Sequence, residues 1–179
     1  MARWEPMLDT LMRERAGGLL AYARLLAGDD AEDVLQDALV KAFSRGRRFP
    51  NVPMAEAYVR RTIPSVFIDR VRRAGAARRA HDKLREVPPH RPDSAEVLDV
   101  RAALARLSPR ERACIVLRFY DDLTVPGIAD RLGIAEGTVK RYLSDASARL
   151  AQELDTVADW RADPTTVPVV APQMKGAGR

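Results

Sequence analysis

LTVPGIADRLGIAEGTVKRYLSDASARL, residues 123–150, is the stretch that decides how the rest of this sequence is interpreted. Its apolar residues have the spacing of two short helices that cross each other. We expect Ala129 to leave room at the crossing, and Gly133 to take the left-handed turn conformation that glycine adopts without strain. The residues expected to form the small core are Ile128, Leu132, Ile134, Val139 and Tyr142. The pattern predicts a helix-turn-helix.

The second helix of this motif has one apolar face and one polar face. At 100° per residue, the apolar stripe contains Val139, Tyr142, Leu143, Ala146 and Leu150, and the opposite face contains Gly137, Lys140, Arg141, Ser144 and Ala148. A small, basic and hydroxylic face fits the major groove of DNA, with Arg141 suited to guanine and Lys140 to phosphate. The alternative is a solvated face in an ordinary helical bundle, which the five matched core positions disfavour.

Composition points to an acidic partner. The 179 residues carry a net charge of +5, with a sequence pI near 9.8 and 31% charged residues, which favours nucleic acid. No run is long and apolar enough for a membrane span or a signal peptide, so we expect a cytoplasmic protein without membrane insertion. Cys114 is expected to be a buried, inert thiol. With only His81 and His90 as histidines, no zinc-site spacing occurs, so we expect no metal site. We also expect no cofactor.

The N-terminal part also has helical periodicity. Steps of three and four residues predict a helix from Trp4 to Leu26, with a break at Gly17 and Gly18. A second helix is expected after Gly28. Its exposed side contains Glu32, Asp33, Gln36 and Asp37.

A basic loop and a third helix follow. The segment SRGRRFPNVPMAE, residues 44–56, is interrupted by glycine and proline and contains an aromatic residue among arginines. A helix is expected from Ala55 to Arg73, with a kink at Pro64, which removes one backbone hydrogen bond. Its polar strip contains Tyr58, Arg61, Thr62, Ser65, Asp69 and Arg72. A solvated helix face is the alternative, but the adjoining basic loop favours a nucleic-acid surface.

The sequence divides into two domains. Small and basic residues after Ala74 lead into PPHRP, which predicts a flexible linker. The expected organisation is a first domain at 1–80, a linker at 81–93, a second domain at 94–155 and a disordered tail at 156–179. Ser108 and Glu111 have the spacing of a capping box that begins a helix. Since no segment alternates like a strand, the predicted fold class is all-α, with two small helical domains.

Two blocks together resemble a known family. AEDVLQDALVKAF at 31–43, with FPNVP at 49–53 and AYVRRTIPSVFIDRVRR at 57–73, resembles region 2 of bacterial sigma factors. Residues 107–150, which include the helix-turn-helix, resemble region 4. The short length without a region 3 domain is similar to the extracytoplasmic-function (ECF) group. The resemblance covers residues 19–153.

The resemblance implies a subunit that binds core RNA polymerase, recognises promoter DNA and assists promoter melting. It assigns core-polymerase binding to Asp33, Gln36 and Asp37. Contacts with the −10 element are assigned to Phe49, Asn51, Tyr58, Arg61, Thr62, Ser65, Asp69, Arg72 and Arg73. Contacts with the −35 element are assigned to Thr138, Lys140, Arg141 and Ser144. An anti-sigma factor is a further partner that the resemblance allows.

This chain departs from the family pattern at three places. Pro64 and Ser65 stand where the family usually has Arg-Asn. The contacts that the family's asparagine makes during promoter melting are therefore not assigned to Ser65. Ala135 replaces a usual capping serine, a loss of about 1 kcal/mol of helix stability. The second helix of the helix-turn-helix also differs from the family pattern around Arg141, so the promoter sequence that this chain prefers does not follow from the resemblance.

Other classes of protein fit less well. A stand-alone regulator of the response-regulator type shares a similar helix-turn-helix, but its receiver domain would alternate strands and helices. A metal-dependent nuclease could use the carboxylates Asp29, Asp30, Glu32, Asp33 and Asp37, but acids at a helix start already favour the helix dipole. No catalytic triad or phosphate-binding loop occurs, so we expect no catalytic residues and no enzyme activity. A structural adaptor remains a further alternative.

Overall fold

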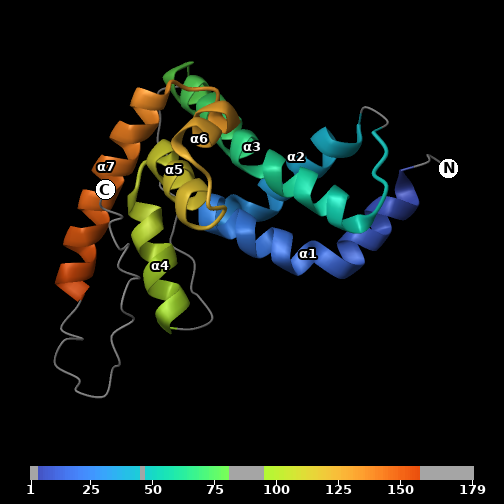
Figure 1. The fold of residues 1–179 in the computed structure, drawn as a ribbon, viewed down its shortest axis with the longest axis horizontal. Coiled ribbons are helices and arrows are strands. Elements are labelled where there is room, and N and C mark those ends of the chain that lie inside the picture. The colour runs from blue at the N-terminus through green and yellow to red at the C-terminus, as the bar shows by residue number, and fades with distance from the viewer. Residues whose placement is uncertain (1–3, 45–46, 81–94, 158–179) are drawn as a thin grey trace, which may run out of the picture.

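A computed structural model describes residues 4–44, 47–80 and 95–157, and within these ranges every regular element is helical (Figure 1). The elements are α1 (Glu5–Ala27), a 3-10 turn η1 (Gly28–Asp30), α2 (Ala31–Phe43), α3 (Val52–Ala80), α4 (Ala95–Arg106), α5 (Pro109–Phe119), α6 (Val125–Leu132) and α7 (Glu136–Val157). The predicted all-α class is confirmed.

The first three helices pack together around one core. The core side chains of α1 are Leu11, Leu19, Tyr22, Ala23 and Leu26. The predicted break at Gly17 and Gly18 is wrong, because α1 is continuous through both glycines. Each glycine costs about 1 kcal/mol in a helix interior. Burial of Leu11 before the pair and of Leu19 after it holds the two halves in one helix.

α2 has the predicted buried stripe. Its buried residues are Ala31, Val34, Leu35, Ala38, Ala42 and Phe43, which pack against α1 and α3. The helix starts directly after η1, where Gly28 has a φ of +57°. That conformation favours glycine and lets the chain reverse between α1 and α2.

α3 is longer than the sequence predicts. It begins at Val52, because the Asn51 side-chain oxygen accepts a hydrogen bond from the Met54 backbone N–H at 3.0 Å. It ends at Ala80, seven residues beyond the predicted end, and the extension is rich in alanine and arginine, which favour helix. Pro64 lies inside α3, where its side chain is fully buried and the helix stays continuous.

The helix-turn-helix is formed by α6 and α7. Thr124 caps α6 by accepting a hydrogen bond from the Gly127 backbone N–H, and Gly133 takes the left-handed conformation, with φ +64° and ψ +43°. The core of the motif contains Cys114, Leu117, Ile128, Ala129 and Val139, with Leu132, Ile134 and Tyr142 packed against it. The predicted motif is therefore present, and α5 completes its core.

The capping box at the start of α5 is also present. Ser108 accepts a hydrogen bond from the Glu111 backbone N–H at 3.4 Å, and the Glu111 carboxylate accepts one from the Ser108 backbone N–H at 2.9 Å. Glu111 is only 4% exposed and accepts a further hydrogen bond from Arg149 of α7 at 3.2 Å. The cap therefore connects α5 with α7.

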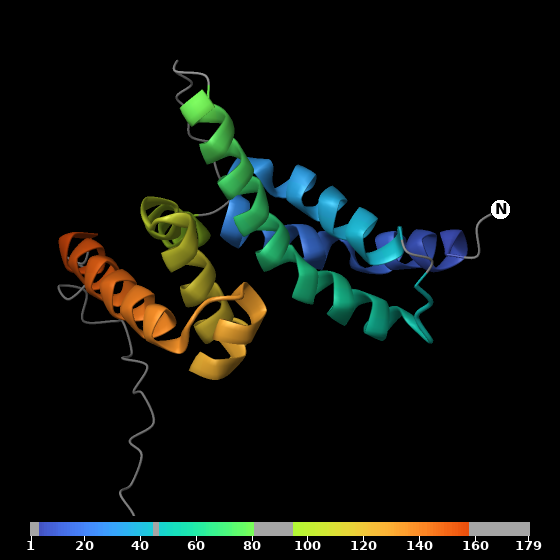
Figure 2. The same cartoon turned by 90° about the horizontal axis from the view of Figure 1, so that it is seen from above.

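The two groups of helices pack against each other, with α5 and α6 beside α1 and α3 (Figure 2). Leu104, Leu107 and Ala113 belong to the same buried cluster as the core of α1, α2 and α3. The predicted linker at 81–93 lies outside the described residues, as does the predicted tail from residue 158. The first two tail residues belong to α7, which ends at Val157.

Removing the Ser108 hydroxyl tests the contribution of the capping box. Ser108→Ala should lower the free energy of unfolding by about 1 kcal/mol, because the N–H of Glu111 loses its acceptor. Urea denaturation followed by circular dichroism measures the change. Ser147→Ala, at an exposed interior position of α7, is the matched control and should change stability by less than about 0.5 kcal/mol. Equal effects would contradict a capping role for Ser108.

Candidate nucleic-acid interface

An aromatic cluster lies at the N-terminal end of α3. The ring centroids of Phe43 and Phe49 are 5.2 Å apart, and those of Phe49 and Tyr58 are 5.4 Å apart. The Arg47 guanidinium carbon lies 4.4 Å from the centroid of the Tyr58 ring, and Trp4 extends the cluster beside Phe43. Phe49 and Tyr58 are half-buried, and Arg47 is exposed. Such a cluster combines flat rings, on which a base can stack, with a cation for phosphate.

Sequence reasoning identified Phe49 and Tyr58 but missed Trp4, Phe43 and Arg47. Phe43 was assigned only to the core stripe of α2, and Trp4 only to the first helix. The contacts that bring them together join positions far apart in the sequence. The run of arginines before Phe49 is the local signal that could have identified Arg47.

The polar strip of α3 is less open than the sequence predicts. Thr62 is only 8% exposed and donates its hydroxyl hydrogen to the Tyr58 carbonyl oxygen at 2.8 Å. The Ser65 hydroxyl donates to the Thr62 carbonyl oxygen at 2.9 Å. Arg61 is exposed. In this arrangement the Thr62 and Ser65 hydroxyl hydrogens are directed to the helix backbone, and Arg61 is the member of this group directed to solvent.

The second half of the strip consists of charged side chains. Arg72 pairs with Asp69 at 3.3 Å, and Arg73 donates to the Asp69 carbonyl oxygen at 3.3 Å. The Arg72 side chain retains 71% of its exposure. An exposed ion pair of this kind contributes at most about 1 kcal/mol, so Arg72 can exchange Asp69 for phosphate.

The acidic face of α2 is tied to α3 by one arginine. Arg70 donates to the Asp37 carboxylate at 2.7 Å and to the Asp33 carboxylate at 3.0 Å. The hydrogen bond to Asp37 is the main cause of a raised pKa of Arg70. Gln36 is exposed beside this pair. Sequence reasoning placed Asp33, Gln36 and Asp37 on one face but missed Arg70, because it belongs to another helix.

The outer face of α7 is open to solvent. Lys140, Arg141 and Ser144 are exposed, and Thr138 is half-buried at the start of the helix. The Arg141 guanidinium carbon lies 5.4 Å from the centroid of the Tyr142 ring. This contact holds the arginine stem along its own helix. The four side chains predicted to contact the −35 element therefore lie along the first two turns and a half of α7.

Comparisons with known proteins agree with this arrangement. The model of the family "Sigma-70 region 2" matches residues 11–77, and that of "Sigma-70, region 4" matches residues 98–150. The chain is 35% identical over 160 residues to the RNA polymerase sigma-E factor of Streptomyces avermitilis, covering 83% of this chain and 85% of that protein. It is 34% identical over 151 residues to the ECF RNA polymerase sigma factor SigM of Mycobacterium tuberculosis, covering 82% and 76%.

A solved structure shares the fold. The sigma factor RpoE from Bartonella quintana, crystallised in complex with the anti-sigma factor NepR, matches with a TM-score of 0.59 at 25% identity, covering 83% of this chain and 96% of that chain. The chain therefore belongs to the sigma-70 family of RNA polymerase sigma factors, within the ECF group. It is a transcription initiation factor.

The described residues contain neither a cluster of three metal-ligating side chains nor a helix long and apolar enough to cross a membrane. Cys114 is fully buried in the core beneath α6 and α7. Burial raises the pKa of the Cys114 thiol to about 11. The thiol therefore stays protonated at neutral pH, as expected for a residue that packs rather than reacts.

The raised pKa of Cys114 predicts slow thiol chemistry. At pH 8 a group with a pKa near 11 is ionised in roughly one molecule in a thousand. Reaction with a disulfide reagent should therefore be at least about a hundred times slower in the folded chain than in guanidinium chloride, and it should accelerate as the pH rises towards the pKa. Stopped-flow absorbance measures both rates. Equal rates in the two conditions would contradict the burial of Cys114.

Proposed function

We propose that this chain binds core RNA polymerase, directs it to promoters through a −10 and a −35 element, and assists opening of the duplex. It would act in the cytoplasm as a subunit that contributes recognition and no catalytic chemistry of its own. The observation that carries the proposal is the presence of two different DNA-compatible surfaces in one chain. One is the aromatic and basic surface of α3, and the other is the exposed polar face of α7.

The surface of α3 suits single-stranded DNA. We propose that Phe49 and Tyr58 stack against an unpaired base, while Arg47 and Arg61 neutralise the adjoining phosphates. Asn51, Asp69, Arg72 and Arg73 would extend this surface along the strand. Because their hydroxyl hydrogens are directed to the helix backbone, Thr62 and Ser65 would accept rather than donate hydrogen bonds towards DNA.

The charge distribution supports different roles for the two DNA-compatible surfaces. Residues 1–93 contain 18 Lys and Arg against 13 Asp and Glu, whereas residues 94–155 contain 9 against 10. Affinity for duplex DNA comes mainly from neutralised phosphates and released counterions. The region that reads the −35 element through α7 is therefore a weak DNA binder alone, and polymerase would supply much of the remaining affinity.

The acidic face of α2 suits a basic surface on polymerase. We propose that Asp33, Gln36 and Asp37 dock there. Hydrogen bonds from Arg70 restrict the orientation of the Asp33 and Asp37 carboxylates. Asp33 retains 61% and Asp37 39% of its side-chain exposure, so both remain accessible to a second cation. By analogy with the RpoE complex, we also propose that an anti-sigma factor can bind this chain.

The stand-alone regulator is the less favoured alternative. Its receiver domain would contain a sheet, and the regular elements within residues 4–44 and 47–80 are all helices. Two of the five acidic residues considered for a nuclease, Asp33 and Asp37, pair with Arg70.

Reconstituted transcription tests the proposed function. Core RNA polymerase supplied with this chain should produce run-off transcripts of defined length from promoters of the same genome, while core polymerase alone should not. A sigma factor of established activity is the positive control. Failure on every such promoter, while the control sigma factor initiates, would contradict the proposal.

Two neighbouring residues of α7 should differ in what they recognise. Arg141→Ala should cost roughly 1 to 3 kcal/mol on the preferred −35 element and relax preference at one base pair, because a bidentate contact to guanine is lost. Lys140→Ala should weaken all sequences alike and reduce the salt dependence. Holoenzyme binding to a set of single-base promoter variants measures both effects. Equal, sequence-independent losses from both substitutions would reject the distinction.

A further inference from the structure

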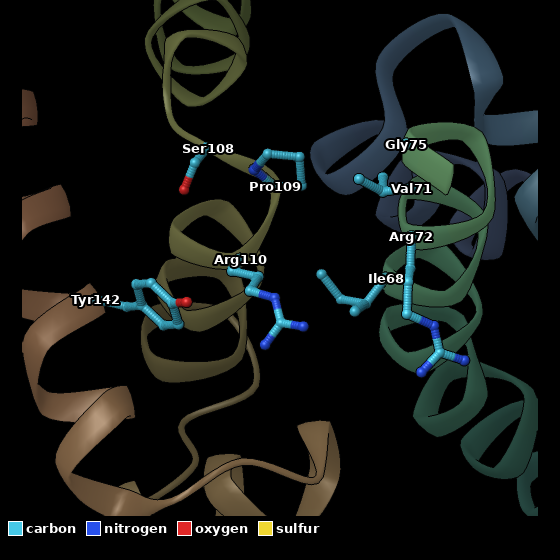
Figure 3. A pocket seen from close by; sticks show the side chains of 8 residues that line it. All are labelled: Ile68, Val71, Arg72, Gly75, Ser108, Pro109, Arg110 and Tyr142. Carbon is cyan, nitrogen blue, oxygen red and sulfur yellow. The ribbon is translucent and has the colours of Figure 1, made fainter. Parts of the chain in front are cut away.

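A cavity of about 420 Å³ lies between α3, the start of α5 and α7 (Figure 3). The residues that line it are Ile68, Val71, Arg72 and Gly75 of α3, Ser108, Pro109 and Arg110 at the start of α5, and Tyr142 of α7. Pockets of roughly 300 to 1,000 Å³ bind small organic molecules and cofactors. The cavity is therefore large enough for one such ligand.

Hydrogen bonds between distant helices position the walls of this cavity. The Asp121 carboxylate, in the loop after α5, accepts hydrogen bonds from Arg60 of α3 at 3.0 and 3.2 Å. It also accepts one from the Tyr22 hydroxyl of α1 at 2.6 Å. Arg112 of α5 donates to the Leu26 carbonyl oxygen at the end of α1 at 2.8 Å. These contacts place α5 beside α3, so both walls of the cavity belong to the packed fold.

The charge in the cavity is positive and has no carboxylate among the lining residues to balance it. Arg72 and Arg110 are the two charged residues of the lining. Arg110 is exposed and makes no ion pair with any residue that the structure describes. Arg72 has only the exposed pair with Asp69 at 3.3 Å. The Glu111 carboxylate, next to Arg110, is occupied by the capping box and by Arg149. The cavity therefore favours an anion.

The first turn of α5 adds to this preference. Ser108 is the N-cap of α5, and Pro109 occupies its first turn. Both residues line the cavity, so the N-terminal end of the helix borders it. The partial positive charge at a helix N-terminus stabilises a phosphate nearby. This contribution supports the two arginines, which carry the full charges.

The remaining lining is apolar and includes one aromatic ring. Ile68, Val71, Pro109 and Tyr142 are half-buried. Figure 3 shows the Tyr142 ring on the α7 side of the space and the Ile68 side chain on the α3 side. A flat ring placed between them would remove apolar surface from water. The cavity thus combines two cations with an apolar surface that suits a flat ring.

We propose that this cavity binds a nucleoside diphosphate. Each of its two phosphate groups would accept hydrogen bonds from one guanidinium, Arg72 on one side and Arg110 on the other. The base would lie against Ile68 and Tyr142. The proposal goes beyond the proposed function, because its ligand is neither promoter DNA nor polymerase. Arg72 is the one lining residue that is also proposed to contact the −10 element.

Two substitutions test the site, each with a matched control. Arg110→Ala removes the cation that has no ion pair, and Arg24→Ala removes the same charge from an exposed position of α1 outside the cavity. Gly75→Leu fills the cavity, since a methyl group at this glycine would meet nothing within 4 Å. Gly18→Leu adds the same side chain at an exposed glycine of α1 that is equally open. Circular dichroism melting verifies that all four variants fold.

Isothermal titration calorimetry of the full-length chain, without polymerase or DNA, measures the affinity. ADP is the probe, because the apolar lining does not distinguish one purine from another. ADP should bind wild type, Arg24→Ala and Gly18→Leu alike, and it should bind Arg110→Ala and Gly75→Leu at least about tenfold more weakly. Pyrophosphate, which lacks the ring, and adenosine, which lacks the phosphates, should each bind wild type at least about tenfold more weakly than ADP.

Three results would overturn the proposal. The first is no binding of ADP at concentrations up to roughly 1 mM. The second is equal affinity of Arg110→Ala or of Gly75→Leu and its control, since the anion would then lie outside the cavity. The third is pyrophosphate or adenosine binding as tightly as ADP, since the ligand would then not need both the ring and the phosphates.

A single-stranded oligonucleotide carries the same phosphate and base groups and is the other source of this chemistry. Tighter binding of the oligonucleotide than of ADP, with a loss in Gly75→Leu, would assign the cavity to nucleic acid and would also overturn the proposal. Because these measurements need neither polymerase nor a promoter, a failure of promoter-specific transcription would count against the proposed function alone.

Discussion

The periodicity of α3 is the constraint on which the structure depends. A helix turns once every 3.6 residues, so side chains close together along α3 point in different directions. The 29 residues of α3 can therefore contact several neighbouring elements along the same length of helix. Val59 and Ile63 are fully buried in the core, while Arg70 reaches α2 and Arg60 reaches Asp121. The remaining face carries the basic and polar residues proposed for DNA. One helix thus connects the first core with α2 and with the loop after α5, and it carries residues proposed for DNA contact.

Pro64 lies at the centre of this helix, and its burial explains how the helix tolerates it. The proline removes one backbone hydrogen bond, at a cost of about 3 kcal/mol in an exposed helix. Here its side chain is fully buried. Burial of the neighbouring Ile63, Val66 and Phe67 in the core offsets part of that cost. Pro64 is therefore compatible with a continuous α3 and with the polar strip that α3 carries.

Local patterns allowed most of the fold to be predicted from the sequence. The stripe of α2, the Ser108 cap and the left-handed Gly133 depend on residues within a few positions of each other, where propensity and geometry decide. The break expected at Gly17 and Gly18 was wrong because burial of Leu11 and Leu19 outweighs the preference of two glycines. The earlier start of α3 follows from a cap at Asn51, which the proline-rich loop concealed, and its later end follows from a segment rich in alanine and arginine.

The candidate site was less accessible to sequence reasoning, because its contacts join distant positions. Arg70 meets Asp33 and Asp37, and Asp121 meets Arg60 and Tyr22, across separations of 33 to 99 residues. No periodicity encodes such pairs. Burial of Thr62 also depends on the packing of neighbouring helices. One residue of the predicted polar strip is therefore largely shielded from solvent. Exposed positions such as Lys140 and Arg141 could be predicted, since a helical wheel alone places them.

The central claim is that one chain reads two promoter elements and sets where polymerase starts. Sequencing the 5′ ends of transcripts made by reconstituted holoenzyme on genomic DNA tests it most directly. The account predicts start sites that share two sequence blocks at a constant spacing upstream, with the distal block alone altered by changes on the outer face of α7. Start sites without a shared upstream pattern, or identical to those of core polymerase alone, would contradict it.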